Sequence, residues 1–146
     1  IEALHPEEGD VVARDFPWGQ LKIINLHHGR SRPVQNLGYV LTIADKKVLH
    51  IGDTEANAKD LQIYRLVDEK IDVGLIPSWY LQYPKWKKGL TQSIQPKSIV
   101  VMHLSPYGSK VSWVERWGGW EKMLAMMRAE FPTARFAIRP GQRFQF

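Results

Sequence analysis

The chain has 146 residues, a formal net charge of +5 and no cysteine. Its 44% hydrophobic content and six tryptophans exclude a disordered tail, and the length suits one domain with a sizeable core. The lack of cysteine excludes disulfides and thiolate metal sites, so any metal would be bound by histidine and carboxylate. No apolar run approaches the roughly 18 residues of a membrane helix, so we expect no membrane span.

Residues 1–146 are interpreted as one continuous unit without repeats or linkers. Residues 1–19 are polar and interrupted by prolines, which predicts an irregular lead-in. The sequence starts at Ile1 rather than methionine, so we expect the natural N-terminus to lie upstream. No targeting signal can be read from it, which leaves the localisation of a soluble protein, cytoplasmic or periplasmic, unknown.

The first half of the chain is predicted to be rich in strands. Strand-forming residues predominate in residues 21–26, and again in 37–44 and 47–51, which a tight turn joins into a hairpin. Apolar residues at helical spacing then predict a helix over residues 56–69. The sheet of this protein should therefore be established early in the sequence.

The second half is predicted to alternate strands with a helix. Residues 72–77 and 98–103 are short apolar strands, and residues 112–131 carry apolar side chains three and four positions apart, as in a helix packed on a sheet. Residues 135–138 and 142–146 are predicted as closing strands. This alternation indicates the α/β class, with a mixed sheet flanked by helices.

Polar groups capable of chemistry occur at three predicted strand ends. They are His28, Asp53 and His103, and the carboxyl ends of strands are where the loops of an α/β sheet converge. Imidazole and carboxylate suit zinc, iron or manganese. Each residue also has an ordinary structural interpretation, as a hydrogen-bonded histidine or a helix cap. His27 alternates in direction with His28, so at most one of them should face a site, and His50 is interpreted as a packing residue.

Together these segments resemble the metallo-β-lactamase superfamily, and within it the ascorbate-6-phosphate lactonase-like branch. The matching features are a histidine before a strand hairpin, the sequence Gly52-Asp53-Thr54 at the hairpin's end, and a later strand that ends in His103. The resemblance covers roughly residues 20–106. It implies a metal-dependent hydrolase acting on a small ester, lactone or phosphodiester.

The resemblance also implies roles for individual residues. His28, or His27 as the alternative, would bind a first divalent ion, and His103 a second. Asp53 would bridge the two ions and act in catalysis. Zinc is expected, with manganese or iron as alternatives. In such a site the two ions share a water or hydroxide and aim it at the substrate.

One departure from the family changes the interpretation. The motif His-x-His-x-Asp-His, which supplies most remaining ligands, is absent, and only 27 residues precede His28. The chain is therefore interpreted as the C-terminal half of a four-layer αββα sandwich. By itself it should be inactive and should expose one apolar sheet face, to be covered by the missing N-terminal half or another subunit. The alternative function is a degenerate, non-catalytic binding domain for an anionic partner.

Three residues are candidates for substrate contact. Trp79 and Tyr80 follow the strand at residues 72–77, and they would either line a pocket or pack in the core. Arg30 would attract an anionic substrate or stabilise its loop. Residues 83–88 interleave aromatics with lysines, a pattern that can bind phosphate or single-stranded nucleic acid but is more typical of a solvated basic loop. A small-molecule substrate is therefore expected rather than nucleic acid.

Overall fold

The computed structural model describes residues 5–29 and 32–146. It contains one seven-stranded sheet in which every strand pairs with the next along the chain. Neighbouring strands among the first four are antiparallel, and the remaining three pairs are parallel. The strands are β1 (Val11–Phe16), β2 (Gly19–Gly29), β3 (Arg32–Ile43), β4 (Lys46–His50), β5 (Val73–Pro77), β6 (Ser98–Met102) and β7 (Ala134–Phe136).

The strand directions determine where a site can form. Because β3 is antiparallel to both of its neighbours, β2 and β4 point the same way, and β5, β6 and β7 continue in that direction. The carboxyl ends of β2, β4 and β6 therefore lie along one edge of the sheet, where side chains from distant parts of the sequence can meet.

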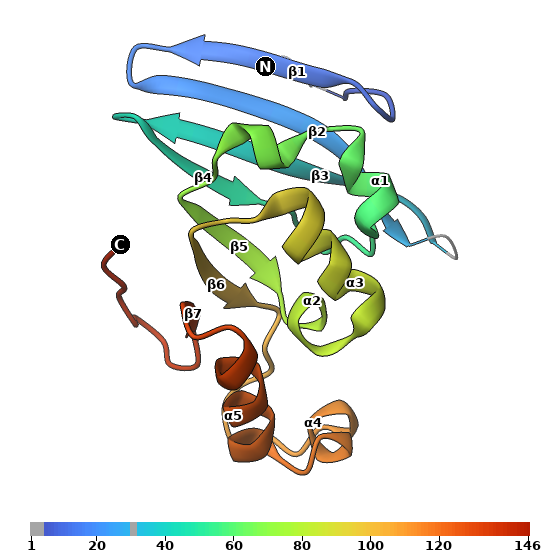
Figure 1. Ribbon diagram of the computed structural model, residues 1–146, viewed down its shortest axis with the longest axis vertical. Helices are drawn as coiled ribbons and strands as arrows, with labels where there is room; N and C mark the ends of the chain where they lie inside the picture. The colour runs from blue at the N-terminus through green and yellow to red at the C-terminus, as the bar shows by residue number, and fades with distance from the viewer. Residues whose placement is uncertain (1–4, 30–31) are drawn as a thin grey trace.

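The helices lie over one face of the sheet, with α1, α2 and α3 in front of it in Figure 1 and α5 beside β7. Their hydrophobic residues join those of the strands in one core. The helical segments are α1 (Ala58–Gln62), the 3₁₀ turn η1 (Leu66–Glu69), α2 (Trp79–Gln82), α3 (Pro84–Lys88), the π-helical η2 (Gly89–Ile94), α4 (Ser112–Arg116) and α5 (Trp120–Glu130). None of the helices in the described ranges is long and apolar enough to cross a bilayer.

The covered face of the sheet holds the core. Ile24, Val40, Leu49, Ile76 and Val101 alternate along five strands and are at most 1% exposed. Burying side chains of this size contributes about 1.5–3 kcal/mol each. The sheet and its helix layer are therefore held together mainly by this apolar contact.

The opposite face of the sheet is also apolar, but no helix among residues 5–29 and 32–146 packs on it (Figure 1). Its side chains alternate with those of the core, and the strand register places them in adjacent positions across five strands. We call this set the open face: Leu21, Ile23, Tyr39, Leu41, Val48, Val73, Leu75, Val100 and Met102. Most of these residues are only partly buried. The open face therefore lacks a helix layer in the described part of the chain.

The N-terminal lead-in is a correction to the sequence prediction. Residues 11–16 form the edge strand β1, which pairs with β2 from Val11↔Ile24 to Phe16↔Gly19. The polar composition concealed this strand because an edge strand on a solvated hairpin needs little burial, and five of its six residues are exposed.

The helices and closing strands also differ from the prediction. The helix expected over residues 56–69 is divided into α1 and η1, with Arg65 in the left-handed region between them. The helix expected over residues 112–131 is interrupted between α4 and α5, where Gly118 and Gly119 adopt positive φ values of 82° and 92°. Residues 142–146 form no strand.

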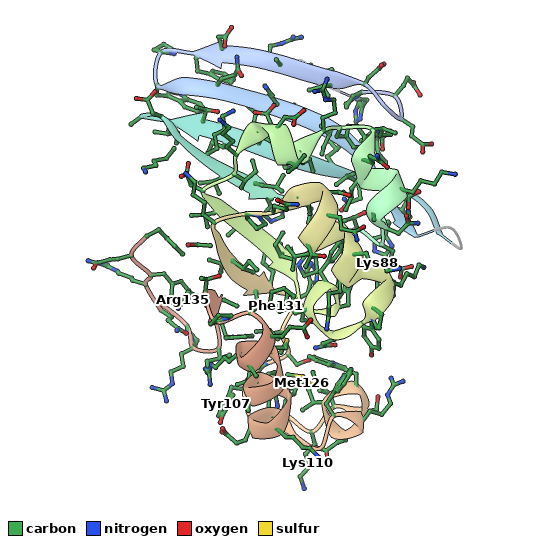
Figure 2. The ribbon with its side chains drawn as sticks, viewed as in Figure 1. Lys88, Tyr107, Lys110, Met126, Phe131 and Arg135 are labelled. Carbon is green, nitrogen blue, oxygen red and sulfur yellow. The ribbon has the colours of Figure 1, made fainter. Side chains whose placement is uncertain are left out.

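Helix α5 ends in side chains that contact the core. Met126 and Phe131 are partly buried against it, and Figure 2 shows both along this segment. In the same view Tyr107 lies beside α5, and Lys110 lies at the lower end of the molecule. The α4–α5 segment thus extends beyond β7 and packs against the hydrophobic core with one side.

Candidate functional site

His28, Asp53 and His103 lie together at the carboxyl edge of the sheet. Nε2 of His28 is 2.7 Å from Oδ2 of Asp53. Nδ1 of His103 is 3.8 Å from Oδ1 of the same carboxylate. Each oxygen of Asp53 thus faces a different imidazole, and the side chains of Asp53 and His103 are 42% and 43% exposed, so ligands can reach them.

The two adjacent histidines near the end of β2 contact different carboxylates. His28 points to Asp53, whereas Nε2 of His27 is 3.0 Å from Oδ2 of Asp60 at the start of α1. The same Asp60 oxygen accepts the backbone N–H of Asn57 in a capping box. His27 therefore ties the helix layer to the sheet, and the alternation expected from a strand places only His28 in the site.

Asp53 is positioned by a tight loop after β4. Oδ1 of Asn36 on β3 accepts the backbone N–H of Asp53 at 2.8 Å, and Nδ2 of Asn36 donates to the carbonyl of Ile51 at 3.0 Å. The intervening Gly52 has a φ of 64°, and a Cβ there would lie 2.2 Å from Oδ1 of Asn36. Only glycine fits this close approach in a left-handed conformation.

Thr54 fixes the same loop to β2. Its hydroxyl donates to the carbonyl of His27 at 2.7 Å and accepts the backbone N–H of Ala56 at 3.0 Å. Thr54 is fully buried. The Gly-Asp-Thr sequence therefore combines a turn, an exposed carboxylate and an anchor, and it holds the strand ends of β2 and β4 together.

His103 follows β6 in the left-handed region, with a φ of 53°. This conformation is uncommon for a residue other than glycine and indicates that its surroundings hold it there. The backbone N–H of Ser78 donates to the carbonyl of Met102 at 3.0 Å, and the Trp79 ring lies 5.3 Å from the His103 ring, centroid to centroid. The start of α2 therefore supports the position of His103.

His50 lies at the end of β4, beside the Asp53 loop. Its Nδ1 accepts the backbone N–H of Gly52 at 3.0 Å. Desolvation by burial, and secondarily the charge of nearby His103, lowers the pKa of His50 below its ordinary value. A neutral imidazole can accept this hydrogen bond, so His50 orients the loop in addition to the packing role expected from the sequence.

A cavity of about 610 Å³ opens beside His28 and Asp53. Its walls come from the strand ends, from the loop after Asp53 and from α2 and α3. The lining residues are His28, Gly29, Asp53, Glu55, Trp79, Tyr83 and Trp86. The size suits a small molecule, and the cavity adjoins the only carboxylate that contacts two histidines in the described part of the chain.

The three predicted substrate residues have different positions. Trp79 lines the cavity. Tyr80 is fully buried, its hydroxyl donates to the carbonyl of Ala56, and burial raises its pKa, so Tyr80 packs in the core and has no exposed surface. Arg30 lies outside the described residues.

Sequence reasoning missed several residues of the site. Asn36 lies just before the strand predicted at residues 37–44, and it holds the Asp53 loop. Glu55, Tyr83 and Trp86 line the cavity, and the last two come from a stretch interpreted as a solvated basic loop. That stretch is largely α3, in which Lys87 pairs with Glu130. The aromatic residues between the lysines were the available signal.

The three strand-end residues are of types that bind metal ions, but they are too few to complete a metal site. No group of three or more histidine, cysteine, aspartate or glutamate side chains in residues 5–29 and 32–146 is arranged to hold one ion. His28, Asp53 and His103 instead supply one imidazole on each side of a single carboxylate. Structural and catalytic zinc sites use about four donors per ion, so two shared ions would need further ligands from elsewhere.

No family model matches the chain, and no curated protein matches its sequence. The geometry of the carboxyl edge is therefore the basis for any functional conclusion. What it establishes is a mixed α/β fold in which three polar strand-end residues and a small-molecule cavity share one sheet edge.

Proposed function

We propose that this chain contributes part of the active site of a metal-dependent hydrolase of the metallo-β-lactamase type. The observation that carries this proposal is the Asp53 carboxylate between two histidines, with one oxygen toward His28 and the other toward His103. A carboxylate placed in this way can be shared by two divalent ions, with one imidazole available to each. The proposed substrate is a small ester, lactone or phosphodiester.

In this proposal His28 and Asp53 hold one ion, while Asp53 and His103 hold the other. Two bound divalent ions would supply Lewis acidity and a water nucleophile for a carbonyl or phosphoryl centre. The chain itself orients the ligands. Asn36 and Thr54 fix the Asp53 backbone, and the Trp79 ring packs beside His103. Zinc suits these donors best, with manganese or iron as alternatives.

The open face supports the further proposal that this chain is the C-terminal half of a four-layer αββα sandwich. Its contiguous apolar side chains need a covering surface, and the incomplete ligand set needs additional donors. A second sheet-and-helix half would supply both, either from an N-terminal half of the same protein or from another subunit.

Metal content of the intact protein tests the proposal. We expect two divalent ions per site by elemental analysis, the loss of about one ion in His28→Ala or His103→Ala, and the loss of both in Asp53→Ala. His5→Ala is the control, because His5 is exposed and hydrogen-bonds only to Gln35 among the described residues. Absence of bound metal, or full hydrolytic activity of His103→Ala, would overturn the assignment.

The non-catalytic alternative has one observation in its favour, the lack of a three-donor group in the described residues. It predicts that the intact protein binds an anionic partner with no stoichiometric metal. Among residues 5–29 and 32–146, the cavity lining contains two carboxylates and no lysine or arginine, which favours a cation over an anion there. The same metal measurement therefore separates the two functions.

A further inference from the structure

The cavity beside the proposed metal ligands has an unusual combination of walls. Three are aromatic, Trp79, Tyr83 and Trp86, and one is the carboxylate of Glu55. In residues 5–29 and 32–146 the Glu55 carboxylate has no hydrogen-bond or ion-pair partner. An acidic group with no partner among the described residues, next to aromatic rings, is well suited to attract a cation.

The two indole N–H groups are already used. Nε1 of Trp79 donates to the carbonyl of Thr54 at 3.0 Å, and Nε1 of Trp86 donates to the carbonyl of Glu55 at 2.8 Å. These bonds fix both rings against the segment that carries Asp53 and Glu55. Both rings line the cavity with their remaining surface, and their indole N–H groups are not available as donors to an anion.

Two of the rings form a corner. Tyr83 and Trp86 are nearly perpendicular, at 80°, with centroids 5.7 Å apart. Trp86 already attracts one ammonium, since Nζ of Lys85 lies 4.8 Å from its ring centroid. Lys85 is not among the residues that line the cavity, so its ammonium does not fill it.

We propose that the cavity formed by Glu55, Trp79, Tyr83 and Trp86 binds an organic cation, a quaternary or protonated ammonium carried by the substrate. This inference rests on the proposed function for its placement beside the reacting centre. The aromatic faces bind the positive charge through their quadrupoles and Glu55 adds a direct charge attraction. The substrate class is accordingly a small ester or phosphodiester with an ammonium group.

The test measures binding of choline to the intact protein by titration calorimetry in the presence of a chelator. 3,3-Dimethylbutan-1-ol is the matched probe, because it has the same shape without the charge. We expect choline to bind about 5- to 30-fold more tightly than this neutral isostere. Equal affinity would mean a merely apolar pocket, and stronger binding of inorganic phosphate would mean an anion site. Either result overturns the proposal.

Variants locate the binding. Glu55→Gln and Trp86→Leu should each weaken choline binding about 3- to 30-fold, with much smaller effects on the neutral isostere. Asp45→Asn is the charge-matched control, because Asp45 lies in the turn between β3 and β4, at the other end of β4 from Asp53. An Asp45→Asn loss equal to that of Glu55→Gln would show a general charge effect and refute the cavity as the site.

This experiment separates the two proposals. It needs no metal and no turnover, so a choline preference in a protein without stoichiometric metal would retain the cation site and reject the hydrolase. Two bound ions in a protein with no choline preference would retain the hydrolase and reject the cation site.

Discussion

The side-chain oxygen of Asn36 accepts the backbone N–H of Asp53, and this bond joins the middle of β3 to the loop that carries the proposed bridging carboxylate. The amide group of the same side chain donates to the carbonyl of Ile51. Asn36 thus satisfies two backbone groups on either side of Gly52. Without the Asn36 side chain, the backbone N–H of Asp53 and the carbonyl of Ile51 would each lose a hydrogen-bond partner at a partly buried position.

We therefore expect Asn36→Ala to lower the free energy of unfolding by about 1–3 kcal/mol, because it leaves buried backbone groups unpaired. The expected effect on the site is larger than on the fold, with metal binding weakened more than 10-fold. Denaturant titration and metal titration measure the two effects. Gln35→Ala is the control, since Gln35 is exposed on the same strand. Equal effects of the two substitutions would contradict the role of Asn36.

Gly52→Ala tests the close approach in the same loop. Its left-handed φ costs a residue with a Cβ about 1–2 kcal/mol, and the new Cβ would also collide with the Asn36 side chain 2.2 Å away. Gly108 has a φ of +81° with nothing within 4 Å of its Cβ position. We expect Gly52→Ala to destabilise the protein by about 1–3 kcal/mol more than Gly108→Ala, as measured by thermal or urea unfolding. A difference near zero would show that the loop adapts freely.

Glu69 on η1 provides a pH-dependent contact between the helix layer and the sheet. Burial alone would raise its pKa, but hydrogen bonds from Lys22 on β2 and Lys47 on β4 lower the pKa below its ordinary value. A carboxyl with a lowered folded-state pKa stabilises the protein above its unfolded-state value, and that stability is lost as the pH falls through the folded-state value.

Glu69→Gln should accordingly lower the free energy of unfolding by about 1 kcal/mol at pH 7, and the difference should shrink below about pH 4. Urea titrations of both proteins from pH 3 to pH 8 measure it. Asp68→Asn is the neighbouring control, because the Asp68 side chain is 55% exposed and pairs only locally with Arg65. A difference that stays constant with pH would mean that Glu69 acts through packing rather than charge.

The central part of the fold was predictable because its signals are local. The hairpin β3–β4 and the strands β5 and β6 have apolar runs bounded by turn residues, and β-strand alternation correctly separated His27 from His28. The edge strand β1 could not be seen because it buries little. The interruption between α4 and α5 depends on two adjacent glycines, whose cost the helical spacing of the tryptophans concealed.

The site was only partly predictable for a different reason. Strand order and direction are tertiary properties, so a sequence can propose that His28, Asp53 and His103 meet but cannot give their distances. Tyr80 and Trp79 are neighbouring aromatic residues. Tyr80 is nevertheless fully buried while Trp79 lines the cavity, because successive side chains on the short helix α2 point about 100° apart. Trp86 enters the site through the placement of α3, and the alternation of aromatic residues with lysines indicates its type but not this position.

The open face gives a prediction that depends on what covers it. Leu75 on β5 belongs to this face, whereas Leu49 on the adjacent strand β4 is fully buried in the core. In the isolated chain we expect Leu49→Ala to cost about 2–5 kcal/mol and Leu75→Ala less than about 1 kcal/mol, because truncation of a partly exposed side chain leaves no closed cavity. In the intact protein the cost of Leu75→Ala should rise toward that of Leu49→Ala. Urea unfolding of both variants in both contexts measures the change, and an unchanged low cost at Leu75 would show that the open face faces solvent and that no second half covers it.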